Sequence, residues 1–193
     1  MTFDFGVKIL AVALSVAWGM SEQAFARRNR RVVGVTADER DKGSFHWITA
    51  SAVVGMSIAG AFGFSGLGGV TNVHVWELLG AFVLLAGTAI RLHAIAVLAN
   101  QFTSRVTILN GHKLVRSGLY RYVRHPSYLG QILILVGIGA LMANVVALLA
   151  APLMTTVALL WRIRVEERAM ADHFGAAYEE YHKTTWRLLP LVW

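Results

Sequence analysis

Long apolar runs bounded by clustered basic residues constrain the fold of this chain more than any other feature. Apart from Lys8 and Arg91, every lysine and arginine falls in residues 27–42, 105–124 or 162–187. Each block adjoins an apolar run that approaches or exceeds the roughly 20 residues that a membrane helix needs. Lysine and arginine gather on the cytoplasmic side of membrane proteins. The three blocks are therefore predicted to share the cytoplasmic face.

The composition also indicates a membrane protein. Of 193 residues, 56% are hydrophobic and 15% are charged, whereas a soluble domain carries about 25% charged residues. The sequence has no cysteine, which excludes disulfides, thiol chemistry and cysteine-based metal sites. The net charge of +7 would suit a nucleic-acid-binding protein, but membrane topology explains the placement of the charges better, so no nucleic-acid partner is expected.

The hydropathy pattern predicts an all-α integral membrane protein with five membrane-embedded helices, its N-terminus outside and its C-terminus in the cytoplasm. The predicted helices are Phe3–Phe25, Phe45–Phe64, Val73–Leu98, Tyr128–Met142 and Val145–Trp161. The last two are short for a membrane of about 30 Å, since 17 residues span only about 25 Å as a helix. We therefore expect a C-terminal helical hairpin packed against the first three helices, followed by a separate charged helix over residues 165–181.

Small residues recur on one face of the second predicted helix. Gly55, Ala59 and Gly63 are spaced by four positions. Such a stripe permits close approach of helix backbones in a membrane, so this face is predicted to pack against a neighbouring helix.

Polar residues flank the C-terminal hairpin at both of its ends. Arg124, His125 and Tyr128 stand at its start, within the run Arg-His-Pro-Ser-Tyr-Leu-Gly. The residues supplied at its far end are Arg162, Arg164, Glu166 and Glu167. Ionisable groups near hydrocarbon are costly and indicate a functional site by default. Because a hairpin returns to the side it started from, the two clusters are predicted to form one polar pocket.

The residue types allow several chemistries at this pocket. Arginine binds carboxylates through paired hydrogen bonds, and Pro126 favours a helix start whose free N–H groups can face an anion. Rossmann and H-E-x-x-H motifs are absent from the sequence. An interfacial salt-bridge belt and bis-histidine haem ligation by His93 and His125 remain alternatives, and Arg91 either snorkels to the headgroups or lines the pocket.

The motifs resemble the isoprenylcysteine carboxyl methyltransferase family. The resemblance covers about residues 85–192, and the first two helices match only in hydropathy. Its motifs are Gly111–Tyr120, Arg124–Gly130, Arg164–Glu167, Phe174-Gly175, Tyr178–Tyr181 and Thr185–Pro190. Phospholipid N-methyltransferases and sterol-type reductases share the Arg-His-Pro and Glu-Glu elements.

The resemblance implies S-adenosylmethionine as cofactor, in a cytoplasmic pocket beneath the C-terminal segment. The spacing of the histidines is not that of a metal site, so no metal is expected. The residues that would bind the cofactor are His112, Val115, Gly118, Tyr120, His125, Pro126, Tyr128 and Glu166. Arg124 and Glu167 would face the methyl acceptor as catalytic residues. The implied acceptor is the carboxylate of a lipophilic, isoprenylcysteine-like substrate that enters from the bilayer.

Three alternatives remain open: methyl transfer to a phospholipid, methyl transfer to another small lipophilic amine or thiol, and a non-catalytic haem-binding membrane protein. An amine acceptor must lose a proton, so it would need a base such as Glu166, Glu167 or His125. The compact chain indicates a prokaryotic inner membrane with the site facing the cytoplasm. We expect one polytopic domain, with N-terminal spans over residues 1–70 and a methyltransferase core over 71–193.

Overall fold

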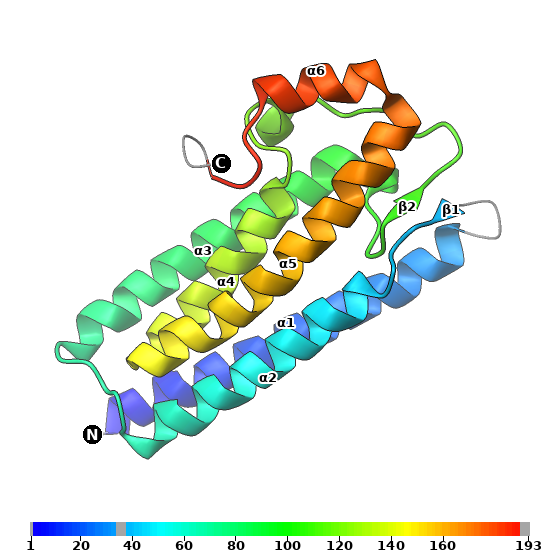
Figure 1. Ribbon diagram of the computed structural model, residues 1–193. Helices are drawn as coiled ribbons and strands as arrows, with labels where there is room; N and C mark the ends of the chain where they lie inside the picture. Colours follow the sequence, from blue (N-terminus) through cyan, green and yellow to red (C-terminus); the bar gives the residue numbers. More distant parts are fainter. Residues whose placement is uncertain (1, 34–37, 190–193) are drawn as a thin grey trace.

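The computed structural model describes residues 2–33 and 38–189, in which five long helices run side by side (Figure 1). These are α1 (Thr2–Val33), α2 (Ser44–Ser65), α3 (Val73–Leu98), α4 (Pro126–Leu141) and α5 (Val145–Phe174). The short helix α6 (Ala176–Thr184) lies across one end of the bundle. At the same end, β1 (Asp38–Glu39) pairs antiparallel with β2 (Thr107–Ile108), and the 3₁₀ turns η2 (Ala99–Gln101) and η3 (Gly118–Arg121) lie between α3 and α4.

The outer surface of the bundle is that of an integral membrane protein. The helices α1, α2, α3 and α5 are long and apolar enough to cross a membrane, and α4 is a shorter apolar helix. On α3, the side chains of Leu78, Phe82 and Leu85 are 74%, 72% and 69% exposed. Contiguous exposed apolar surface of this kind requires an apolar environment. The all-α membrane fold predicted from the sequence is confirmed.

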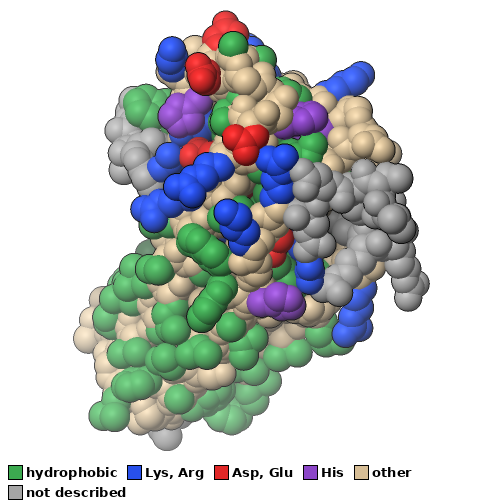
Figure 2. Space-filling view, turned by 45° about the vertical axis from the view of Figure 1, so that its right-hand side comes forward, with side chains coloured by type: hydrophobic (Ala, Val, Ile, Leu, Met, Phe, Trp, Pro, Cys, Tyr) green, Lys and Arg blue, Asp and Glu red, His purple; other side chains and the backbone are tan. Residues whose placement is uncertain are grey.

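Charged and apolar side chains occupy different ends of the molecule. Figure 2 shows lysine, arginine, aspartate and glutamate gathered over one part of the surface and apolar side chains over the other. The end of α1, the strand β1, the segment between α3 and α4, and α6 all lie at one end of the bundle (Figure 1). The segments that carry the three basic blocks therefore meet at one end, as the sequence predicts.

Both ends of α3 and the start of α5 agree with the sequence prediction, whereas the end of α5 does not. The predicted end at Trp161 is wrong, because α5 continues as one helix of 30 residues to Phe174. No glycine or proline occurs between residues 162 and 174, so nothing in this charged stretch breaks the helix. Gly175, with φ of 54°, ends it. The predicted separate helix over residues 165–181 is instead the last turns of α5 followed by α6.

A glycine seam, formed by Gly80, Gly87, Gly130 and Gly137, joins α3 to α4 at backbone contact. A Cβ atom placed on Gly137 would lie 2.6 Å from the backbone nitrogen of Leu84. Placed on Gly130, it would lie 2.7 Å from the carbonyl oxygen of Gly87. Larger residues would therefore push the two helices apart, and the seam fixes α4 against α3.

The predicted small-residue face of α2 packs against α5. A Cβ atom on Gly55 would lie 2.5 Å from the Cα atom of Ala151. Ala59 is 4% exposed, and a Cβ on Gly63 would lie 2.9 Å from the sulfur of Met142, in the turn that leads into α5. This packing confirms the prediction made from the four-residue spacing.

Candidate active site

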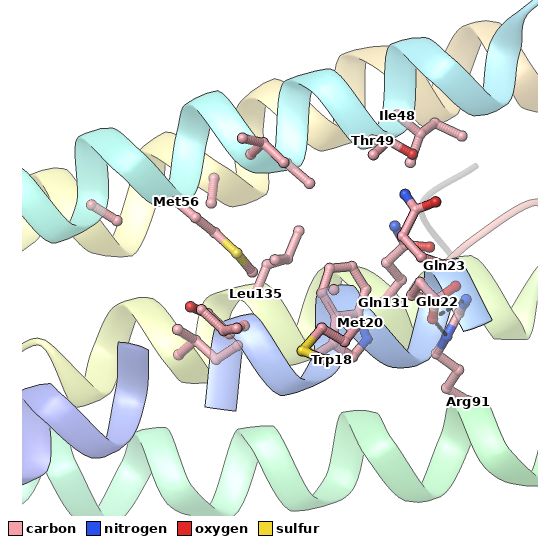
Figure 3. Close-up of a pocket in the computed structure, with 18 of the residues that line it drawn as sticks. Trp18, Met20, Glu22, Gln23, Ile48, Thr49, Met56, Arg91, Gln131 and Leu135 are labelled. Carbon is pink, nitrogen blue, oxygen red and sulfur yellow. Dashed lines mark hydrogen bonds and ion pairs between the residues drawn. The ribbon is translucent and has the colours of Figure 1, made fainter. Parts of the chain in front are cut away.

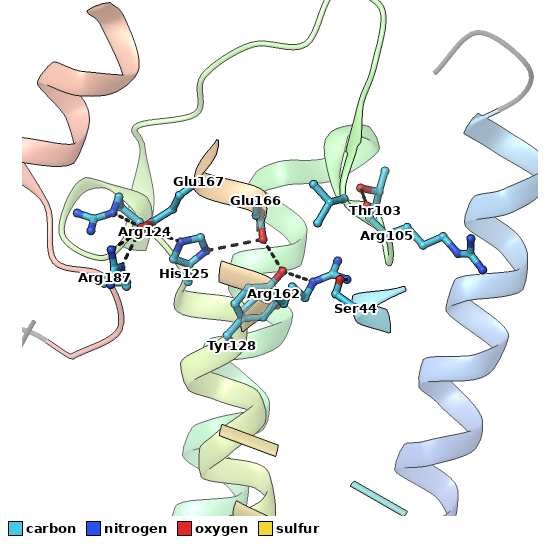
Figure 4. Close-up of polar contacts among 12 residues, drawn as sticks. Ser44, Thr103, Arg105, Arg124, His125, Tyr128, Arg162, Glu166, Glu167 and Arg187 are labelled. Atoms are coloured by element: carbon cyan, nitrogen blue, oxygen red, sulfur yellow. Dashed lines mark hydrogen bonds and ion pairs between the residues drawn. The ribbon is translucent and has the colours of Figure 1, made fainter. Parts of the chain in front are cut away.

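The two polar clusters predicted to meet do so where α4 begins and the last turns of α5 pass (Figure 4). Pro126 is the first residue of α4, and the backbone before it is held by the C-terminal segment. The Arg124 N–H donates to the Trp186 carbonyl at 2.8 Å, and the His125 N–H donates to the Arg187 carbonyl at 3.2 Å. The chain after α6 thus positions the Arg-His-Pro residues.

Glu167 lies at the centre of a closed ionic cluster, which we call the Glu167 cluster, with Arg124, His125 and Arg187. Arg124 Nε donates to Glu167 Oε1 at 3.0 Å, and Arg187 Nη2 lies 2.9 Å from Oε2. His125 Nε2 is 3.4 Å from Oε1. The Arg124 guanidinium also donates to the carbonyls of His182 and Thr185. Two arginines thus balance one buried carboxylate and tie α5 to the C-terminal segment.

Glu166, the preceding residue, belongs to a different group. The Tyr128 hydroxyl donates to Glu166 Oε2 at 2.5 Å and accepts from Arg162 Nε at 2.6 Å. The ring of His125 stacks on that of Tyr128 with centroids 5.4 Å apart, and His125 Nδ1 is 3.9 Å from Glu166. Tyr128, Arg162, Glu166 and Asp41 make up what we call the Tyr128 cluster.

Asp41 anchors Arg162 from the segment before α2. Arg162 Nη1 donates to Asp41 Oδ1 at 2.9 Å and to Ser44 Oγ at 3.1 Å, while Nη2 donates to the Ser104 carbonyl at 2.9 Å. Burial alone would raise the pKa of Asp41, but Ser44, Arg162 and two backbone N–H groups together hold this pKa below its ordinary value. Asp41 is therefore a carboxylate that fixes the direction of the Arg162 guanidinium.

A polar pocket of about 90 Å³ lies between the segment preceding α4 and the helices α5 and α6. Of the predicted cofactor residues, it is lined by His112, Val115, Tyr120, His125, Tyr128 and Glu166. Burial of His112, with a smaller contribution from the nearby His173, lowers the pKa of His112 despite the opposing charge of Glu166. Burial also raises the pKa of Tyr120, the first of several causes, so this phenol stays protonated.

The other predicted site residues lie elsewhere. Gly118 faces α3, because a Cβ atom there would lie 3.1 Å from His93 Nε2 and 3.2 Å from Val97. Pro126 is buried at the first turn of α4. Arg124 lines the polar pocket, whereas Glu167 does not. That Arg124 and Glu167 face the methyl acceptor stays a prediction.

A much larger apolar cavity of about 830 Å³ lies between α1, α2, α4 and α5. Its walls include Trp18, Met56 and Leu135 (Figure 3). Met20 and Val53, also in the lining, are 67% and 59% exposed. The cavity is therefore open to the surroundings of the helices on the side of α1 and α2.

The apolar cavity and the polar pocket share part of one wall. Phe102, Thr103, Tyr128 and Arg162 line both. A polar ligand in the pocket and an apolar ligand in the cavity would therefore meet at Tyr128 and Arg162. This arrangement suits the transfer of a group between a water-soluble donor and a lipid-like acceptor.

Residues 78–172, from α3 to the last turn of α5, match the model of the isoprenylcysteine carboxyl methyltransferase family. This part of the chain belongs to that family. The match includes the whole polar stretch before α4 and both glutamates, so most of the two clusters lie in the part of the chain that the isoprenylcysteine carboxyl methyltransferase family has in common. Asp41 and Arg187 lie outside it.

Curated relatives agree with the family. The chain is 38% identical over 81 residues to the protein-S-isoprenylcysteine O-methyltransferase of Schizosaccharomyces pombe, which covers 42% of this chain and 34% of the relative. It is 32% identical over 122 residues to protein-S-isoprenylcysteine O-methyltransferase A of Arabidopsis thaliana, covering 62% of each. The chain thus spans from about a third to about three fifths of the length of these relatives.

A solved structure with the same fold is similar over most of the chain. It is the eukaryotic intramembrane Ras methyltransferase of the isoprenylcysteine carboxyl methyltransferase family, with a TM-score of 0.58 and 26% sequence identity. The alignment covers 78% of this chain and 53% of that one. The helical membrane architecture is therefore that of the family.

Several residues of the Tyr128 cluster and of the two cavities were not assigned a role from the sequence. Asp41 stands in a charged loop three residues before Ser44, where α2 begins, but the N-cap of α2 is Gly43, so no capping pattern marks Asp41 in the sequence. Gln131 is a lone amide in the apolar run of α4, and this alone could have marked it. Arg162 was noted only as part of a cluster.

The haem alternative lacks a matching geometry. His93 lines neither of the two cavities, and both ring nitrogens of His125 face glutamates. Within residues 2–33 and 38–189, no group of three or more histidine or acidic side chains is placed to hold a metal ion.

Proposed function

We propose that this protein transfers a methyl group from S-adenosylmethionine to the carboxylate of a lipophilic, isoprenylcysteine-like acceptor at the membrane. The observation that carries the proposal is the wall shared by the polar pocket and the apolar cavity at Tyr128 and Arg162. A family of carboxyl methyltransferases needs these two compartments, one for a charged cofactor and one for a prenyl chain.

The side chains of the polar pocket suit this cofactor. Glu166 and the faces of Tyr120 and Tyr128 offer negative charge and aromatic surface to a sulfonium cation. Apolar groups, Ile108 and Met170 among them, offer a surface for an adenine ring. The positive charge of Arg124, which also lines the pocket, is balanced by Glu167 and so does not repel a cation strongly.

The cofactor requires the outer wall of the polar pocket to move. Its volume of about 90 Å³ is below the roughly 300 Å³ at which small-molecule pockets begin. The inner walls are the helices α4 and α5, whereas residues 99–117 contain only η2 and β2. We therefore place the opening in this segment, which supplies Gln101, Val106 and His112 to the lining.

Bound S-adenosylmethionine supplies a methyl group on a positively charged sulfur. The protein's own task is to aim the acceptor carboxylate at it, since a carboxylate is already nucleophilic at neutral pH and needs no general base. We propose Arg162 for this role in place of Arg124, because Arg162 lines both cavities while Arg124 lines the polar pocket alone. Its hydrogen bonds to Tyr128, Asp41, Ser44 and Ser104 use four of the five guanidinium donors, which leaves one N–H for the acceptor.

Positioning of this kind contributes several kcal/mol to catalysis. The prenyl chain would enter between α1 and α2, where Met20 and Val53 line the opening, and would stay in an apolar environment throughout. The stacked rings of His125 and Tyr128 would shield the reacting end from water.

We further propose that the charged end of the bundle faces the cytoplasm, because the basic segments gather there. A cysteine introduced at Asn72 should react with a membrane-impermeant reagent added outside intact cells, and one at Lys113 should not. The opposite labelling pattern would overturn this orientation.

Calorimetry and a transfer assay test the function. The purified protein should bind S-adenosylhomocysteine and transfer labelled methyl groups to N-acetyl-S-farnesylcysteine. Phosphatidylethanolamine serves as the comparison acceptor. Labelling of the phospholipid alone would replace the carboxylate acceptor by an amine, and a haem absorption band without cofactor binding would refute the methyltransferase assignment.

A further inference from the structure

The apolar cavity is not apolar along its whole length. Figure 3 shows Met56 and Leu135 at one end and Glu22, Gln23 and Gln131 at the other, near Arg91. A prenyl chain cannot form hydrogen bonds, and polar side chains in a membrane-embedded wall are costly. The polar end therefore indicates a second polar group on the acceptor.

Gln131 is the most telling residue of this end. It is 5% exposed and lines the cavity from α4. Among the side chains and backbone groups that the structure describes, none forms a hydrogen bond with its carboxamide, which is open to the cavity rather than sealed inside the protein. An amide that faces an apolar cavity without a protein partner is costly unless a ligand satisfies it.

The indole of Trp18, on α1, also lacks a hydrogen-bond partner within the described residues. It lines the same cavity, and its Nε1 is buried. Trp18 and Glu22 are four residues apart, so they share one face of α1. An N–H donor on one wall and a carboxamide on the other together offer both donor and acceptor groups.

The carboxylate at this end, that of Glu22, is paired with a cation. Both Nε and Nη2 of Arg91 contact Glu22 Oε1, at 2.9 and 2.6 Å, and Arg91 Nη1 donates to Ser127. An ammonium group would find no uncompensated negative charge here, whereas a neutral amide would find matched hydrogen bonds. The polar end therefore favours an amide over an amine.

The position along α4 fits an amide next to the reacting carboxylate. Gln131 follows Tyr128 by three residues, which places it on the same face and about 4.5 Å further along the helix. In an amino acid, the nitrogen is two bonds from the carboxyl carbon, which agrees with this offset.

We propose that Gln131 determines acceptor specificity by hydrogen-bonding an amide group adjacent to the carboxylate that is methylated, with the Trp18 indole as a second donor. This inference rests on the proposed function. It assigns to this chain a preference for N-acylated or peptide-linked amino acid acceptors over plain lipophilic acids.

A pair of acceptors that differ only in the amide tests the proposal. These are N-acetyl-S-farnesylcysteine and 3-(farnesylthio)propanoic acid, which keeps the carboxylate, sulfur and prenyl chain. The wild type should favour the amide acceptor about ten-fold in kcat/KM, the scale of a buried hydrogen bond. In Gln131→Met, which keeps the length of the side chain, most of this preference should disappear through loss of the amide acceptor's rate.

Two controls separate this inference from its alternatives. Met56→Leu changes the same cavity without touching a polar group and should affect both acceptors alike. Calorimetric binding of both acids without cofactor gives a readout independent of turnover, and Gln131→Leu provides a second variant if Gln131→Met does not fold, as judged by S-adenosylhomocysteine binding.

The failures are distinguishable. If the wild type methylates neither acid, the proposed function fails. If it methylates both equally well, or if replacing Gln131 lowers both alike, the specificity role is refuted while the methyltransferase assignment stands.

Discussion

Glu166 and Glu167 are neighbours in the sequence, yet they serve two different parts of the molecule. Glu167 is held by Arg124, Arg187 and His125, and its side chain is 10% exposed. Glu166 has the Tyr128 hydroxyl as its close partner and is 28% exposed toward the polar pocket. Consecutive helix residues point about 100° apart, which is enough to separate them.

The difference lies in charge balance. Two arginines surround Glu167, so it has little negative charge left to offer a ligand, and its removal would strand both cations. The negative charge of Glu166 faces a pocket lined by aromatic rings. Two adjacent acidic residues in a membrane protein can therefore have different roles, one as a structural anchor and the other as a group that faces a ligand.

The largest expected effect is on stability, for Glu167→Gln. This change leaves Arg124 and Arg187 buried without a counter-charge, and the free energy of unfolding should fall by about 3–5 kcal/mol. Thermal unfolding in detergent measures it. Glu166→Gln is the matched control and should change the free energy of unfolding by less than about 1 kcal/mol. Equal losses of stability in the two variants would contradict the proposed difference between the two glutamates.

A smaller effect is expected on turnover, for Arg162→Lys. Lysine keeps the charge but loses the planar guanidinium, so kcat/KM for the prenylcysteine acceptor should drop ten-fold or more, about 1.4 kcal/mol. Affinity for S-adenosylhomocysteine should be kept. Arg124→Lys should reduce the unfolding temperature more and kcat/KM less, and the reverse ranking would move the acceptor arginine to the Glu167 cluster.

The third effect concerns the charge of the cofactor, for Glu166→Gln. Sinefungin carries a cationic amine where S-adenosylhomocysteine has a neutral sulfur. Loss of Glu166 should weaken sinefungin by about 1 kcal/mol and weaken S-adenosylhomocysteine less. Calorimetry with both ligands tests this prediction. An equal loss of affinity for the two ligands would mean that Glu166 shapes the pocket but does not recognise the charge of the ligand.

The smallest effect is the pH dependence of stability through His112. Its pKa is lowered by burial and by His173, and Glu166 opposes this. The folded protein therefore binds the proton less readily than the unfolded chain, so this contribution to stability is complete above about pH 6.5 and is lost as the pH falls through the lower folded-state pKa. Unfolding temperatures between pH 7.5 and 5.5 should show a shallower decline in His112→Asn, and a steeper one in Glu166→Gln.

Much of this architecture could be predicted from local patterns. The helix Val73–Leu98 agrees with its prediction because a charge-free glycine turn precedes it and a polar segment follows. The meeting of Arg124 with Glu167 follows from a hairpin that returns to its starting side. These features depend on hydropathy and on the direction in which each helix runs, and both can be read directly from the sequence.

Most of the missed features depend on long-range contacts, but the end of α5 does not. A run of charged residues does not end a helix, and Gly175 is the local signal that does. Asp41 reaches Arg162 across 121 positions, and no local pattern distinguishes it from a solvated loop residue. Likewise, nothing in the run around Gln131 reveals that α1 places Trp18 opposite it.

The glycine seam between α3 and α4 has a consequence for how such a protein can diversify. It locks the half that holds Arg124, His125 and Tyr128, and the family match at residues 78–172 coincides with this half. By contrast, 11% of the α1 span is buried, against 39% of the α5 span. Natural variation in the sparsely buried α1 wall can therefore reshape the apolar cavity while the residues proposed to carry methyl transfer stay in place.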